Sequence, residues 1–425
     1  MRFPVAATLV TVLGCVHAAP APDALRAGEL SPSSILGLRE QGPAGLNTIL
    51  AALDAATEPA VRARLIDAIT GVAGQKDAHV SRLYWYENLD DALAAAKLSG
   101  KPVLSLRMLG RLDEELSCAN SRFFRTTLYG NTAVSSFLRE RFVLHWSSER
   151  PVPVVSIDFG DGRKVTRTIT GNSVHYVLDA RGNVVDALPG LYSAQAFLET
   201  LQRSEEIAKV SGRLDGVMRA QAVQTWHEEE IRNSLRRYQD DLAKVGIKQI
   251  SYALPTVPGL QITDVWPSSR VAVPMAMGKA VVELPMVKQL VPDGGAKAPI
   301  DPTPWERIAS ARKSQLDASS RALVLSKNPV DVTSPQAPRL SPALAIQMIE
   351  RLEQSIDVDT ARNEYALHAV IHLWLSENPG VAMKDFNREV YARLFLTPAT
   401  DPWLGLVPAL AWTGLPNDGI EITQR

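Results

Sequence analysis

The chain has 425 residues, of which 46% are hydrophobic and 21% are charged, and its formal net charge at pH 7 is -1. A chain of this length and composition is expected to form two or three domains with sizeable cores, which excludes a protein disordered throughout. The balanced charge gives no electrostatic case for binding to nucleic acid or to an anionic membrane.

The first residues have the pattern of a targeting segment. Arg2 is followed by a largely apolar run, and small residues at cleavage spacing precede Pro20. The run is too short to span a bilayer, so residues 1–18 are predicted to be a signal peptide of a periplasmic or secreted protein. Cys15 follows Val-Leu-Gly, which also fits a lipoprotein box, so a lipid anchor at Cys15 is the alternative to simple cleavage. Residues 19–34, rich in Ala and Pro, are predicted to be a tether.

Residues 35–80 are predicted to form a helical hairpin. Two apolar faces repeat at helical spacing, and they consist of Leu46, Ile49, Leu50 and Leu53, and of Val61, Leu65, Ile66 and Ile69. Such faces are typical of helices that pack on a neighbouring core.

Residues 81–203 alternate between strand and helix patterns. The predicted strands are 83–86, 102–106 and 142–146, the predicted helices are 90–97, 119–128 and 132–141, and a hairpin is predicted over 176–185. A second hairpin is expected over 151–170, with Val155, Ile157 and Phe159 packing to one side. This alternation predicts an α/β layer fold.

The same stretch resembles the thioredoxin-like superfamily. The resemblance is carried by an Ala-rich helix, Gly100-Lys101-Pro102-Val103-Leu104, a cysteine before a helix, a Phe-Val strand, Leu178-Asp179-Ala180-Arg181-Gly182 and Pro189-Gly190. It covers residues 82–202, under a third of the chain. It implies a thioredoxin-like domain with an inserted β-hairpin, extended by the helical hairpin before it and by a mainly α C-terminal region.

In that family the attacking thiolate sits at a helix N-terminus, where backbone N–H groups and the helix dipole stabilise it. Cys118 would hold this position, with Ser117 as the predicted N-cap. Ser121 stands where the second cysteine of the family is expected, Trp is missing before Cys118, and Asn172-Ser173 stands where a cis-proline normally faces the thiol. Cys118 and Ser121 are therefore a candidate thiol site without dithiol chemistry. Cys118 is either a reactive monothiol or an inert buried hydrophobe.

The histidines offer two further hypotheses. A Cys–His pair would require His145 or His175 on the Cys118 side of the sheet, whereas the simpler interpretation is a histidine bonded within the sheet. His368 and His372 are four residues apart and share a helix face, which is metal-ligand spacing, but only Glu364 offers a third ligand on that face. They are interpreted as core or interface histidines, and no metal or cofactor is predicted. His227 is expected on a solvated helix beside Trp226.

The rest of the chain is predicted to be mainly α. Residues 204–250 are predicted to be a helical connector, 251–304 a Pro-rich irregular segment, and 305–425 a mainly α domain with helices at 305–325, 343–356, 360–375 and 385–396.

The sequence is consistent with two functions. The first is a binding or scaffold role in the cell envelope, with an unknown protein partner, for a thioredoxin-like domain with a degenerate active site. The alternative is a monothiol redox protein that forms mixed disulfides or a sulfenic acid through Cys118.

Overall fold

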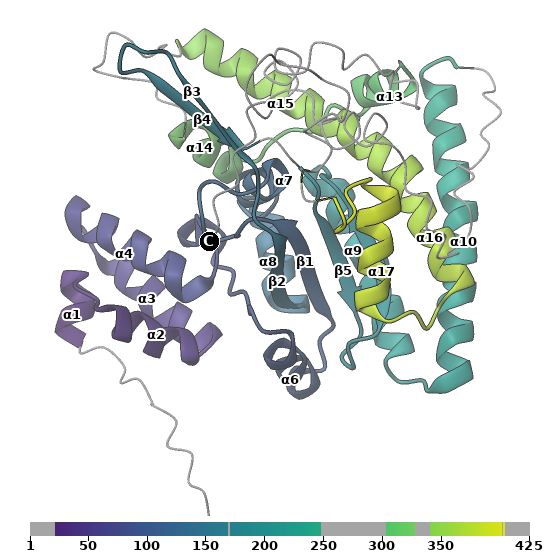
Figure 1. The fold of residues 1–425 in the computed structure, drawn as a ribbon, viewed down its shortest axis with the longest axis horizontal. Helices are drawn as coiled ribbons and strands as arrows, with labels where there is room; N and C mark the ends of the chain where they lie inside the picture. Colours follow the sequence, from purple (N-terminus) through teal and green to yellow (C-terminus); the bar gives the residue numbers. More distant parts are fainter. Residues whose placement is uncertain (1–21, 169–170, 248–302, 328–340, 402, 404–425) are drawn as a thin grey trace, which may run out of the picture.

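The computed structural model describes residues 22–168, 171–247, 303–327, 341–401 and 403. The expected signal peptide with Cys15, and all but the last two residues of the Pro-rich segment 251–304, lie outside the described residues. Within the described ranges the protein is mixed α/β, with a small sheet between layers of helices (Figure 1). None of the helices in these ranges is both long enough and apolar enough to cross a bilayer.

The central sheet has four strands in the order β2-β1-β5-β6. They are β1 (Val103–Leu109), β2 (Val143–Arg150), β5 (Val174–Leu178) and β6 (Val184–Pro189). β1 runs parallel to β2 and antiparallel to β5, and β5 is antiparallel to β6. Each of these four strands overlaps a run predicted from sequence and extends beyond it by two to four residues. The expected strand at 83–86 is reduced to a single parallel bridge between Tyr86 and His145.

Neighbouring side chains on β5 show what covers each face of the sheet. His175 contacts the rings of Phe124 and Phe197, which lie on η1 (Phe124–Leu128) and α9 (Ala194–Ser211). Tyr176 contacts the ring of Phe386 on α17 (Met383–Glu389). Because successive strand residues point to opposite faces, α9 and α17 cover opposite sides of the sheet.

Local signals set the ends of the helices that connect the strands. Asn88 caps α6 (Leu89–Ser99) by accepting hydrogen bonds from two backbone N–H groups, and Gly100 ends the helix in the left-handed conformation. Asn131 caps α8 (Thr132–Arg141) in the same way as Asn88. Both patterns are common at helix ends.

The N-terminal helices form a cluster with a core of its own. They are α1 (Pro22–Ala27), α2 (Pro32–Glu40), α3 (Pro43–Ala55), α4 (Pro59–Ala73) and α5 (Ala78–Ser81). α3 and α4 correspond to the predicted helical hairpin. The tether predicted at 19–34 is wrong for residues 22–34, because α1 and the start of α2 are helical there, and Leu25 and Leu30 pack on this core.

The remaining described helices form a layer beside the sheet. They are α10 (Gly216–Lys244), α13 (Thr303–Arg312), α14 (Ala318–Ser326), α15 (Pro342–Arg362), η2 (Asn363–Leu367), α16 (His368–Glu377), α17 and η3 (Val390–Leu394). The helix predicted at 305–325 is divided into α13 and α14, and Lys313 between them has a positive φ of 50°. α10, predicted as a connector, lies along α16 (Figure 1).

This helical layer shares the main hydrophobic core with the sheet. The shared core includes Ile356, Val370, Ile371, Trp374, Leu375, Phe386, Val390, Tyr391, Leu394 and Phe395 together with residues of all four strands. The sequence left open whether the C-terminal region stands apart or wraps the first domain. Because they contribute to this core, residues 341–401 wrap the sheet, and a smaller separate cluster that includes Tyr238, Trp305 and Tyr365 joins α10, α13 and η2.

The inserted hairpin is a separate two-stranded sheet. Its strands are β3 (Val154–Asp158) and β4 (Lys164–Thr168), and they project from the body of the molecule (Figure 1). Val155 and Ile157 are half-buried on one side, as expected. Phe159 does not pack with them, since it is 55% exposed and lies under the guanidinium of Arg163.

We predict that Gly190→Ala destabilises the protein more than Gly160→Ala does. Both glycines have positive φ, +80° and +77°, so each alanine costs about 1–2 kcal/mol of backbone strain. At Gly190 the new Cβ would lie 2.5 Å from Nδ2 of Asn363, which donates to the Leu191 carbonyl, whereas nothing lies within 4 Å at Gly160.

Chemical denaturation measures the difference between these two variants. We expect Gly190→Ala to lose about 1–3 kcal/mol more, the range for disrupting a buried hydrogen bond. Equal losses would contradict the docking of Asn363 on this loop.

Candidate functional site

Cys118 lies at the start of a helix, as expected. It is the N-cap of α7 (Ala119–Phe123), which continues into η1, and its carbonyl accepts a hydrogen bond from the Arg122 N–H at 3.2 Å. The prediction that Ser117 is the cap is wrong by one residue, because the helical hydrogen bonds already start from the Cys118 carbonyl.

The Asn172-Ser173 loop faces the thiol. Ser173 directly precedes β5, and its Oγ lies 3.0 Å from the Cys118 Sγ. Either atom can be the donor in this contact. The thiol therefore has a hydroxyl neighbour at the place where the resemblance expected a proline.

The thiol site is closed to solvent. Cys118, Ser117, Ser121 and Ser173 all have an exposed fraction of 0%. Ser121, a candidate partner of the thiol, has its hydroxyl 2.6 Å from the Ser117 Oγ and 2.9 Å from the Cys118 carbonyl oxygen. These hydrogen bonds go to groups other than the sulfur.

The C-terminal segment holds the loop that faces the thiol. The Tyr391 hydroxyl donates to the Asn172 carbonyl at 3.3 Å, and the Asn172 amide donates to the Thr397 hydroxyl at 3.1 Å. The Arg150 guanidinium donates to the carbonyls of Thr397 and Asp401. Any approach to Cys118 from this side would have to break these contacts.

Two arginines near the thiol are used to hold backbone. Arg122 donates to the Ser117 carbonyl and to the Thr168 hydroxyl, and Arg125 donates to the Glu114 carbonyl at 2.7 Å. Burial lowers the pKa of Arg125. They fix the loop before Cys118 and the base of the β3–β4 hairpin.

His145 and His175 have partners other than the thiol. His145 Nδ1 lies 2.8 Å from the hydroxyl of Ser105, its register partner on β1, so it is bonded within the sheet. His175 Nε2 lies 2.6 Å from the Tyr129 hydroxyl. Burial lowers the pKa of each histidine to about 3. Both are therefore neutral at physiological pH.

A second polar cluster lies inside the protein, where β6 meets the C-terminal helices. It consists of Asp186 on β6, His227 on α10, and His368 and His372 on α16, with exposed fractions of 0%, 0%, 4% and 2%. The prediction that His227 lies on a solvated face is wrong. α10 packs against α16 and β6, so this face of the helix is buried.

Hydrogen bonds connect the members of this cluster. His368 Nε2 lies 2.8 Å from the Asp186 carboxylate, and the Ser204 hydroxyl donates to the same carboxylate at 2.6 Å. His227 Nδ1 lies 2.8 Å from His372 Nδ1, and His227 Nε2 lies 3.0 Å from the Val185 carbonyl.

Burial and mutual contact shift the pKa values of Asp186, His227 and His372. Burial opposes ionisation of Asp186, but the neighbouring His368, His372 and His227 outweigh it and hold the pKa of Asp186 below its usual range. Burial lowers the pKa of His227 to about 4, and burial together with His368 lowers the pKa of His372 well below its usual value. The Asp186 carboxylate thus lies in the interior beside two imidazoles, His227 and His372, whose charged forms are disfavoured.

Sequence reasoning found only half of this cluster. The i, i+4 spacing identified His368 and His372, but their third ligand candidate is Asp186, which is far away in sequence, and not Glu364. Glu364 instead pairs with Arg312 at 2.6 Å. The one sequence signal for Asp186 is an acidic residue inside the apolar strand Val184-Val185-Asp186-Ala187-Leu188.

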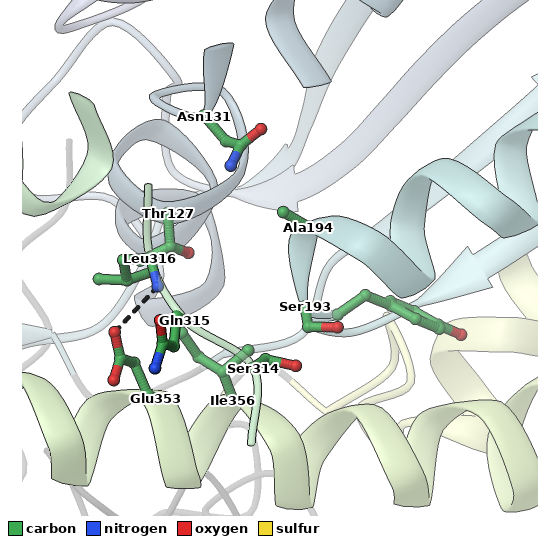
Figure 2. A pocket seen from close by; sticks show the side chains of 10 residues that line it. Thr127, Asn131, Ser193, Ala194, Ser314, Gln315, Leu316, Glu353 and Ile356 are labelled. Carbon is green, nitrogen blue, oxygen red and sulfur yellow. Dashed lines mark hydrogen bonds between the residues drawn. The ribbon is translucent and has the colours of Figure 1, made fainter. Parts of the chain in front are cut away.

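A small cavity lies between η1, the loop before α9, and α15 (Figure 2). Its volume is about 20 Å³, and its lining includes Thr127, Tyr192, Ser193 and Ile356. Among the residues that the structure describes, the buried Tyr192 hydroxyl there has no hydrogen-bond partner. The volume suits one water molecule and is far too small for an organic substrate.

Comparisons with known proteins give no match: no family model, no curated protein and no solved structure is significantly similar to this chain.

We predict that His175→Phe flattens the pH dependence of stability below neutrality. The unfolded pKa is about 6.5 and the folded pKa about 3, so between these values the unfolded chain binds a proton that the folded chain does not. Stability therefore falls as pH falls from 6.5, by about 1.4 kcal/mol per pH unit for this histidine. Denaturation between pH 6 and pH 4 should show a slope smaller by that amount in the variant.

Phe197→Leu is the matched control, because it disturbs the same aromatic packing without removing a titrating group. It should keep the wild-type slope. An unchanged slope in His175→Phe would contradict the buried neutral histidine.

Proposed function

We propose that this chain is an exported thioredoxin-like protein whose thiol site no longer performs redox chemistry, and which acts as a binding or scaffold protein in the cell envelope. The observation that carries the proposal is the complete burial of Cys118, with its sulfur 3.0 Å from the Ser173 hydroxyl. A thiol reacts as the exposed thiolate, so a sulfur without solvent contact is not accessible to a substrate disulfide.

The order of elements supports the thioredoxin-like part of the proposal. Helix α6, strand β1, a helix beginning at Cys118, strand β2 and the β5–β6 hairpin follow one another as in the resemblance. Ser173 also meets the sulfur from the position that faces the active thiol in that family.

The surroundings of the thiol support loss of redox function. Ser121 replaces the second cysteine, so no internal disulfide can form at this site. The segment that carries Tyr391 and Thr397 is hydrogen-bonded to the loop facing the sulfur. A redox protein would need this segment to open in each cycle, whereas a scaffold would use it as ordinary core packing.

Thiol accessibility tests the proposal against its alternative, a monothiol redox protein. In a Cys15→Ser chain, Cys118 is the sole thiol. We predict that it reacts with an aromatic disulfide reagent at least about 100-fold more slowly than an exposed thiol, because reaction requires a local opening of about 3 kcal/mol or more. Unfolding in denaturant should restore full reactivity.

The benchmark thiol is Leu98→Cys in a Cys15→Ser/Cys118→Ser chain, since Leu98 is 92% exposed on α6. If Cys118 in the folded chain reacts as fast as this benchmark, the redox alternative replaces the scaffold proposal.

Affinity capture from envelope extracts without reductant separates the two functions directly. A scaffold should hold the same partners in the Cys118→Ser chain as in the parent. Partners that reductant releases, and that Cys118→Ser fails to capture, would instead identify a mixed-disulfide mechanism.

A further inference from the structure

The cluster around Asp186 combines ligand groups from parts of the chain that are far apart. A carboxylate oxygen of Asp186 and one ring nitrogen each of His368 and His372 lie within 4.8 Å of one another. β6 contributes the carboxylate, and α16 contributes both imidazoles from one face at i, i+4 spacing. Their rings are 4.1 Å apart, with 30° between their planes.

Hydrogen bonds around the cluster leave one ring nitrogen of His372 for a metal ion. The Val185 carbonyl only accepts, so His227 Nε2 is the donor in that contact. The Nδ1 atoms of His227 and His372 lie 2.8 Å apart, so one of them donates to the other. Because His372 Nδ1 is engaged with His227, Nε2 is the nitrogen of His372 that can bind a metal ion.

A metal ion would bind between His368 Nε2 and the Asp186 carboxylate. In the metal-free protein, His368 Nε2 donates to the carboxylate over 2.8 Å. A divalent ion would bind the Nε2 lone pair once that proton has moved to Nδ1 of the same ring, and the charge of the ion would balance the buried carboxylate.

The groups outside the ligand set also match those of a metal site. Ser204 donates to the second carboxylate oxygen, and the Ala187 N–H donates to the first, so the carboxylate orientation is fixed. His227 orients His372 from the other side. Ligating side chains in metal sites are held by hydrogen bonds of this kind.

We propose that Asp186, His368 and His372 bind one divalent transition-metal ion, zinc by the chemistry of the ligands. Two imidazoles and a carboxylate suit zinc, whereas calcium and magnesium require oxygen ligands. The site is buried and lies between β6, α10 and α16, so a bound ion would join α16 to the sheet, and its three protein ligands would leave a fourth coordination position open.

Metal titration of the full chain tests the proposal. Protein dialysed against chelator should take up one equivalent of Zn²⁺ in calorimetry, with a rise in Tm of at least about 4 °C at saturating metal. Co²⁺ in place of Zn²⁺ should give visible d–d absorption of a low-symmetry nitrogen–oxygen site, without thiolate charge transfer. Absence of stoichiometric binding and of the Co²⁺ spectrum in the wild-type chain would overturn the proposal, whatever the variants do.

Variants locate the ion. His372→Gln and Asp186→Asn should each abolish the stoichiometric binding and the metal-dependent rise in Tm. His145→Gln is the matched control, because it removes a buried histidine outside the cluster, and it should keep both. Binding that persists in folded His372→Gln and Asp186→Asn chains would place the ion elsewhere and overturn the assignment.

Discussion

The packing of the C-terminal helices against the sheet determines how both buried polar sites are enclosed. Trp374, Phe386 and Tyr391 are fully or almost fully buried in the same core as the strands, so the face of the sheet that carries Tyr176 is covered by the C-terminal segment. That packing closes the thiol site, where Tyr391 is bonded to the loop before β5. It also encloses the Asp186 cluster, since α16 lies against the edge strand β6, and Arg219 and His227 of α10 contact the carbonyls of Val184 and Val185 on that strand.

The two buried sites differ in the charge of their central group. Cys118 is neutral as a thiol, so burial costs little and the Ser173 hydroxyl is enough to accommodate it. Asp186 carries a charge into the interior, where an unpaired carboxylate would be strongly destabilising. The cluster therefore requires His368, Ser204 and the backbone N–H of Ala187 as direct partners. Hydrogen bonds that compensate a buried charge are therefore needed at Asp186 and not at Cys118.

Local patterns predicted much of the fold. The run after Gly100 became β1, the apolar repeat before Arg141 became α8, and Cys118 was placed at a helix start, because short-range propensity and capping decide these features. The candidate site was harder, because burial is not local. Ser121 suggested a partner for the thiol, yet its hydroxyl is bonded to Ser117 and to backbone. Asp186 meets His368 across 182 positions in the chain, and no spacing rule reaches that far. His227 was assigned to solvent because the helix partner that buries it was not apparent from sequence.

The shared core implies that the sheet and the C-terminal helices unfold as one cooperative unit. Amide hydrogen exchange under native conditions, resolved by peptide, measures this cooperativity. We expect amides in β5, β6 and α16 to exchange only through a common global opening and to respond in parallel to added denaturant. Exchange of α16 through a separate, lower-energy opening while β5 and β6 stay protected would contradict it.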